Sequence, residues 1–207
     1  MSPTPAERRA ATGRYHHGDL RTALTDAAAE LVAERGVRGF SLAEVSRRLG
    51  VSPRAPYRHF ADREALLATV VVRAYTELAA MLPAGTADDP GERLAAIAGA
   101  YVRFAAERRA LFEAVFAASV DKARFPEIAA AAEPVDTAVR RCVQELCPGD
   151  PAAAAALEDA VTAGAHGHAT LLLDGAYGTG PAAARRAARK AAGAARALVI
   201  GRAALAE

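Results

Sequence analysis

The sequence contains no tryptophan, only two cysteines, and few aromatic side chains of any kind, with Phe, Tyr and Trp making up 5% of its 207 residues. The two thiols, Cys142 and Cys147, are five positions apart on one expected helix, so they point in different directions and are poorly placed to form a disulfide. Because no metal-type spacing of cysteines occurs, we expect neither a bound metal nor a cofactor. Both residues are interpreted as buried or half-buried thiols of a reducing compartment.

Long apolar runs are missing as well. The longest stretches, around 169–173 and 197–200, are too short to cross a bilayer. The first 15 residues are polar, so no signal peptide is expected. These absences predict a cytoplasmic protein that makes no membrane contact.

The sequence also lacks the short motifs that mark many catalytic sites. It has no nucleophile elbow, no P-loop and no residue spacing typical of metal ligands. We therefore expect no enzyme. A helical adaptor without DNA affinity is a further rival interpretation, and a gel shift with DNA from upstream of its own gene would separate both rivals from a sequence-specific DNA-binding protein.

Alanine is abundant, in runs such as Ala129–Ala132 and Ala152–Ala156. Because alanine is the best helix former and 52% of the residues are hydrophobic, the sequence predicts a folded, all-α protein. We count about nine helices and no strand. They are arranged as an N-terminal three-helix head on a larger C-terminal helical bundle.

Helix start and stop signals divide the head clearly. The first helix is expected from Asp19, as its cap, to Arg35. Ser41 and Glu44 form a capping box at the start of the second helix, which Gly50 ends.

The third helix is expected to begin at the Ser52 cap, with Pro53 in its first position, and to run to Phe60. Pro56 lacks the N–H that should bond to the Ser52 carbonyl, so the first turn is predicted to be distorted or to start late. Ala55 and Pro56 also offer apolar surface that suits a thymine methyl, although a simple packing role explains them equally well.

The later helices carry similar signals. Asp62 is expected to cap a long fourth helix that ends near Leu82, and Pro134 is expected to kink or break a later one. Further helix starts are indicated by an early proline, at Pro90, Pro126, Pro151 and Pro181.

Charge is unevenly distributed. Residues 1–60 hold ten arginines against six acidic residues, an excess of four positive charges, whereas the remainder carries a net charge of −2. Arginine suits phosphate and guanine edges, so the head is the expected nucleic-acid surface.

The third helix and its surroundings resemble the signature of TetR-type regulators, in the order Val51-Ser52, Tyr57-Arg58-His59-Phe60, Arg63 and Leu66-Leu67. Residues 15–21 are similar to the opening of one subgroup, whose C-terminal domain bears a Trp-His-Gly motif. Here Ala165-His166-Gly167 stands at that motif, without the Trp. The resemblance implies a sequence-specific DNA-binding transcription regulator, by default a repressor.

The resemblance and the helical positions together predict the DNA-contacting residues. Tyr57 either packs its ring or reaches a phosphate through its hydroxyl, and His59 either contacts DNA or caps and packs. Arg63 matches a phosphate-contacting Lys or Arg at the start of the fourth helix. The full predicted set is Ser41, Arg47, Ser52, Pro53, Arg54, Ala55, Tyr57, Arg58, His59 and Arg63.

Three regions are expected: a flexible basic arm (1–18), a helix-turn-helix DNA-binding domain (19–66), and a ligand-sensing and dimerisation domain (67–207). The arm either reaches the minor groove or is a solvated terminus. A homodimer through the last two helices would read a near-palindromic double-stranded operator. A small, mostly apolar effector is expected in a pocket, whose candidate lining residues serve equally well as plain core: Tyr101, Phe104, Phe112, Phe116 and His166.

Overall fold

The computed structural model describes residues 17–36, 39–83, 87–117, 120–121 and 123–205, so the predicted arm falls almost entirely outside the described residues. Within them the chain is all-helical, as predicted, with eight α-helices and no strand, close to the expected nine. Two short 3-10 segments, η2 (Pro56–Arg58) and η3 (Arg202–Leu205), complete it. The α-helices are α2 (His17–Arg35), α3 (Leu42–Leu49), α4 (Arg63–Met81), α5 (Pro90–Glu107), α6 (Arg109–Ala117), α7 (Pro126–Leu146), α8 (Pro151–Leu173) and α9 (Gly180–Ile200).

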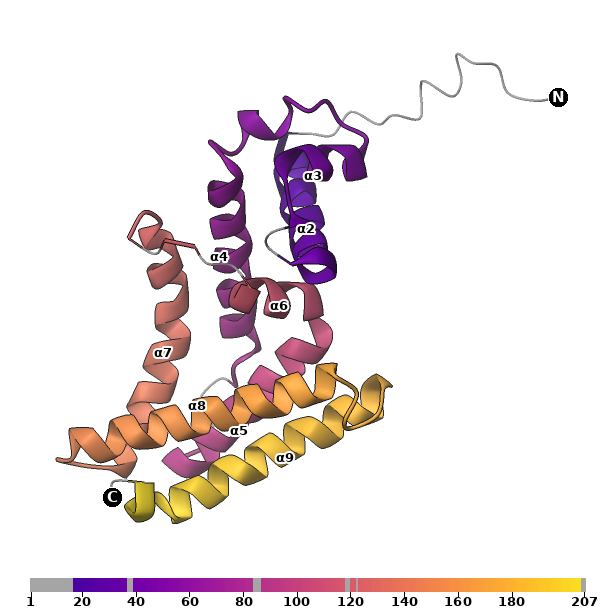
Figure 1. Cartoon of the computed structure of the whole chain (residues 1–207). Helices are drawn as coiled ribbons and strands as arrows, with labels where there is room; N and C mark the ends of the chain where they lie inside the picture. The colour runs from indigo at the N-terminus through magenta and orange to yellow at the C-terminus, as the bar shows by residue number, and fades with distance from the viewer. Residues whose placement is uncertain (1–16, 37–38, 84–86, 118–119, 122, 206–207) are drawn as a thin grey trace.

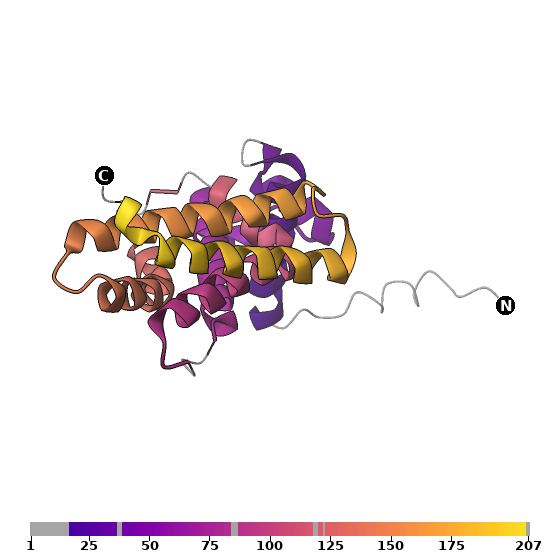
Figure 2. The same cartoon turned by 90° about the horizontal axis from the view of Figure 1, so that it is seen from below.

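A small head stands on a larger helical body (Figure 1). The head consists of α2, α3, η2 and the first turns of α4, and α4 continues from it into the body. α5, α8 and α9 pack against one another across the end far from the head, and α8 and α9 form its outer face (Figure 2). α4 therefore connects the two parts directly.

The predicted caps of the head are largely confirmed. The Ser41 side chain accepts a hydrogen bond from the Glu44 amide at 3.1 Å, and Gly50 ends α3 with a left-handed φ of +65°, which favours glycine. The Asp62 side chain likewise accepts from the Ala65 amide at 2.8 Å. The first helix begins two residues earlier than expected, at His17, so Asp19 is not its cap.

The predicted third helix is wrong in form. Between Gly50 and Asp62 the only regular element is the three-residue η2. Tight bonds close the segment, with the Ala55 amide donating to the Ser52 carbonyl at 2.8 Å and the His59 amide to the Pro56 carbonyl at 2.9 Å. Because Pro56 has no N–H, an α-helical bond to Ser52 cannot form, and the distortion expected from this proline is confirmed and extends through the segment.

Of the kink or break expected at Pro134, the break is absent. This proline lies inside the continuous α7, on an exposed side. The carbonyl that loses its partner is that of Ala130, also exposed, so water can satisfy it. α8 is also continuous through Gly164.

One apolar core runs from the head into the body. In the head, Leu24, Leu31 and Val45 are fully buried. In the body, alanines of α9 let it approach α5 closely: a Cβ on Gly99 would lie 3.4 Å from the Ala188 carbonyl oxygen. No helix among the described residues is long and apolar enough to span a bilayer.

Ion pairs join head and body at two places. In the first, Arg73 of α4 pairs with Asp26 of α2 and with Glu77, which in turn accepts from Arg108 at 2.5 Å.

The second junction is at the start of α4. Arg124, just before α7, pairs with Asp62 and, at 2.5 Å, with Glu64. Behind it, Phe125 and Ile128 pack with residues of α4 in a small apolar cluster. The first turn of α7 is thus fixed to the first turn of α4, and we call this contact the Arg124 clamp.

Candidate nucleic-acid interface and cavity

The segment from Ser52 to Arg58 presents polar and basic side chains on the outside of the head. Ser52, Pro53, Arg54, Tyr57 and Arg58 are exposed, and the Tyr57 side chain is 61% accessible. Arg54 and Arg58 form no ion pair with any described residue. Their forked donors are therefore available to phosphate oxygens or base edges.

Buried and hydrogen-bonded groups hold this segment in place. Pro56 and Phe60 are buried beneath it. Arg21 of α2 donates to the His59 carbonyl at 2.8 Å, and its guanidinium lies 4.6 Å from the centre of the Phe60 ring. Sequence reasoning did not foresee this role of Arg21, because the two segments it joins meet only in the folded head.

One suggested contact is contradicted by the structure. Pro56 is buried, so the suggested contact of its ring with a thymine methyl is wrong. Ala55 and His59 are half-buried, while Ser41 is exposed at its cap position.

The remaining predicted arginines are engaged within the head. Arg47 donates to Glu44 at 2.5 Å, and this hydrogen bond lowers the pKa of the Glu44 carboxyl despite some desolvation. Arg63 is half-buried, donates from Nε to the Phe40 carbonyl at 3.0 Å, and lies 5.2 Å from the centre of the Phe40 ring. Arg63 therefore also supports the start of α3.

The body contains an apolar cavity of about 470 Å³ between α4, α5, α6, α7 and α8. All five residues predicted as pocket liners border it. The Tyr101 hydroxyl lies 3.1 Å from Nδ1 of His166, and the Phe116 ring centre is 4.4 Å from that of His166. The Phe112 ring lies 5.5 Å from His166 and stacks on it.

The cavity reaches from the core to the surface. Phe104 and Phe112 are buried, whereas Phe116 is 56% exposed. Burial raises the pKa of Tyr101, so its hydroxyl remains a neutral hydrogen-bonding group. Sequence reasoning missed Tyr75 and three carboxylates that also border the cavity, Asp136, Glu158 and Asp159, because nothing local in the sequence shows which acids face a cavity.

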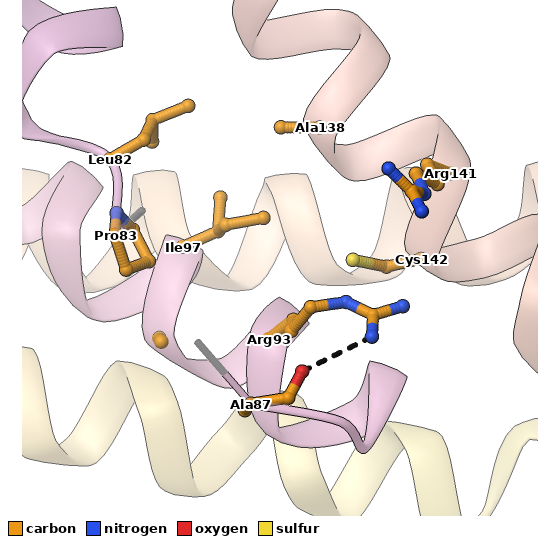
Figure 3. Close-up of a pocket in the computed structure, with 9 residues that line it drawn as sticks. Leu82, Pro83, Ala87, Arg93, Ile97, Ala138, Arg141 and Cys142 are labelled. Carbon is orange, nitrogen blue, oxygen red and sulfur yellow. Dashed lines mark hydrogen bonds between the residues drawn. The ribbon is translucent and has the colours of Figure 1, made fainter. Parts of the chain in front are cut away.

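A second hollow of about 290 Å³ lies next to the first and shares Leu82 and Ile97 with it. Figure 3 shows Arg93 and Arg141 on either side of Cys142, with Arg93 hydrogen-bonded to the Ala87 carbonyl at 3.2 Å. Arg93 and Arg141 both pair with Glu145.

Cys142 is buried and Cys147 half-buried, both as free thiols, as predicted. Among the described residues no cluster of His, Cys, Asp or Glu could hold a metal ion.

Comparison with known families gives two matches. Residues 24–70 match the family described as bacterial regulatory proteins, tetR family. Residues 94–195 match the family described as tetracyclin repressor-like, C-terminal domain.

A curated relative is the uncharacterized HTH-type transcriptional regulator YobS of Bacillus subtilis (strain 168), 34% identical over 100 residues. This match spans 48% of the present chain and about half, 52%, of the relative.

Solved structures resemble most of the chain. A protein of unknown function from Rhodococcus sp. RHA1 is 31% identical with a TM-score of 0.64, covering 88% of this chain and 96% of that one. The TetR family transcriptional regulator PfmR from Thermus thermophilus is 20% identical with a TM-score of 0.68, covering 86% of this chain and 97% of that one, a similarity of fold alone.

Proposed function

The chain belongs to the TetR family of bacterial regulatory proteins, and from this premise we propose that it is a dimeric repressor released from its operator by a small effector. As a family member it is a transcription regulator that binds DNA through a helix-turn-helix. The sign of regulation, the effector and the residue roles are the proposal. The observation that carries it is an exposed recognition segment followed directly by α4, a helix that also borders an apolar cavity.

The recognition segment is proposed to enter the major groove. Arg54 and Arg58 extend from it without intramolecular ion pairs among the described residues, and Ser52, Pro53, Ala55 and Tyr57 lie along the same segment. Arg54 is assigned to base edges, because bidentate contact with guanine is the commonest specific readout by arginine. Ser41, Arg47, His59 and Arg63 are assigned to the sugar-phosphate backbone, which positions the head without reading sequence.

The link between cavity and head is proposed to run through α6 as well as α4. Phe112 and Phe116 of α6 border the cavity, while α6 also packs against α2 of the head. A ligand that displaces these rings would shift the helix that supports α2. It can weaken operator binding only by the difference between its affinities for the two arrangements, typically about 1–3 kcal/mol.

Dimerisation is proposed through α8 and α9, the outer face of the body. Leu171 of α8 and Ile200 of α9 are exposed there, and Gly193 has no neighbour within 4 Å of an added Cβ among the described residues. Small residues allow two copies to bring these helices close together. Two heads would then address half-sites about 34–36 Å apart, or a small multiple of that spacing.

A gel shift with DNA from upstream of its own gene tests the function. We expect a sequence-specific band that survives excess random competitor and weakens as salt rises. Loss of the band in the presence of that excess of random competitor DNA would contradict a sequence-specific regulator.

A further inference from the structure

We propose that the cavity binds an amphiphilic cation, an apolar body carrying one ammonium-like charge at the cavity edge. This inference rests on the proposed function and names the chemical class of the effector. Its volume of about 470 Å³ falls within the range of small-molecule sites, which is about 300–1,000 Å³.

Three carboxylates border the cavity and no arginine or lysine does, among the residues described. Asp136 comes from α7, while Glu158 and Asp159 come from α8. None of the three forms an ion pair or hydrogen bond within the described part of the chain, in contrast to Glu145 nearby, which binds two arginines. The charge at this edge is therefore negative, and no described residue forms an ion pair with it.

The negative edge extends toward the aromatic interior. The pKa of Tyr75, which borders the same cavity, is raised by burial and further by the negative charge of Asp136. Tyr75 and Asp136 lie on different helices, α4 and α7, so the carboxylate acts across the cavity wall.

Aromatic faces supply the second attraction for a cation. Tyr101, Phe112 and Phe116 surround His166 with ring centres 4.4–6.3 Å from it. The faces of such rings carry partial negative charge and attract ammonium groups. α8 also contributes Ala163 and Ala165 to the lining, and their small side chains leave room for an apolar body.

The neighbouring hollow offers the alternative of an acidic ligand. It contains Arg93 and Arg141 (Figure 3). Arg93 is already bound to Glu145 and to the carbonyls of Ala87 and Asp88, and Arg141 to Glu145, so these donors are engaged within the protein, although the single Glu145 carboxylate balances only one of the two charges. We therefore assign the ligand of the larger cavity to the cationic class and include an anionic probe in the test.

Three probes of one shape but different charge test the proposal on the full chain by calorimetry: 4-phenylbutylammonium, 4-phenylbutanol and 4-phenylbutanoate. We expect the cation to bind about tenfold more tightly than the alcohol, from one exposed ion pair and one cation–π contact, and the carboxylate to bind most weakly. In the double variant Asp136→Asn/Glu158→Gln the preference for the cation over the alcohol should fall to about twofold or less. Glu127→Gln, an exposed acid of α7 that does not border the cavity, should leave it unchanged.

Several results would overturn the cationic class. Equal binding of the alcohol and the cation, tighter binding of the carboxylate, a preference that survives in the double variant, or no binding by any probe would each do so. The proposed repressor function is tested separately by the gel shift without ligand. Binding by the alcohol or the carboxylate alone would leave an effector cavity in place while removing its preference for cations.

Discussion

At the scale of single residues, the arginines of the head differ in their surroundings. Arg54 is exposed and has no described ion-pair partner, whereas Arg63 donates to the Phe40 carbonyl and lies against the Phe40 ring. Substitution of Arg54 should therefore report on recognition alone. Substitution of Arg63 should report on recognition and stability together.

Arg54→Ala should cost about 1–3 kcal/mol of binding free energy on the cognate operator and relax its specificity, because a bidentate base contact is lost. Titrated gel shifts on operator and random DNA measure both effects. Equal losses on the two DNAs would instead place Arg54 on a phosphate.

Arg63→Ala should weaken binding to all sequences alike and reduce the salt slope by about one. It should also lower the free energy of unfolding by about 1 kcal/mol, because the Phe40 carbonyl loses a donor. Arg63→Lys is the matched control: it should keep the salt slope, which follows charge, and lose part of the stability. An unchanged salt slope in Arg63→Ala would remove this residue from the interface.

At the scale of elements, the turn between α3 and the recognition segment depends on one backbone conformation. Gly50→Ala should lower the free energy of unfolding by about 1–2 kcal/mol, because a side chain at left-handed φ is strained. Gly50→Asn, which tolerates this region better, should cost about half as much. Denaturant unfolding measures the free energy of unfolding of both variants. Equal losses in Gly50→Ala and Gly50→Asn would show that the left-handed φ is not the cause.

The same elements show how far the sequence predicts this structure. The caps at Ser41, Gly50 and Asp62 were predictable because each depends on residues a few positions away. Pro56 predicted distortion but not its extent, since the outcome also depends on burial of its ring beneath the head. The carboxylates that border the cavity and the Arg21 contacts were not predictable, because they depend on segments far apart in the sequence that meet only in the fold.

At the scale of the whole molecule, the Arg124 clamp connects the cavity wall to the head. α7 borders the cavity through Val135, Asp136 and Val139, and its first turn is held to Asp62 and Glu64 at the start of α4. The clamp also compensates two carboxylates that stand beside Arg63.

Arg124→Ala should reduce operator affinity about three- to tenfold at low salt, because both carboxylates would then repel phosphates within a Debye length. Gel shifts at two salt concentrations measure the effect. Arg140→Ala also removes one positive charge, but from α7, where Arg140 pairs with Glu133 of its own helix, and it should change affinity less than twofold. Similar losses in the two variants would reduce the clamp to a general charge effect.

The clamp also predicts a dependence of stability on pH. The hydrogen bond from Arg124, followed by that from the Ala65 amide, lowers the pKa of Asp62 below its usual 3.8. A lowered pKa contributes stability that is complete above the usual value and is lost as the pH falls toward the lowered one. Unfolding experiments should therefore separate wild type from Arg124→Ala at neutral pH and bring them together in acid. A difference that persists at low pH would contradict this linkage.

The proposed dimer gives a prediction for the whole particle. Light scattering at micromolar concentration should report about twice the chain mass of 21.4 kDa. Leu171→Glu, which places a charge at an exposed position of α8, should shift the measured mass toward that of the monomer. Thr76→Glu, at an exposed position of α4, should leave the mass unchanged. A monomeric wild type would contradict the dimer. A dimer that Leu171→Glu leaves intact would show that the interface lies elsewhere on the chain.

Pro56 keeps the recognition segment from becoming an α-helix, and together with Pro53 it also affects the thermodynamics of association. A segment with two fixed φ angles and a buried ring has lost its conformational entropy when the head folds, before DNA arrives. Operator binding should then involve no coupled folding of this segment. Its heat-capacity change should match the apolar surface buried at the interface alone, and helical circular dichroism should not increase when the operator is bound.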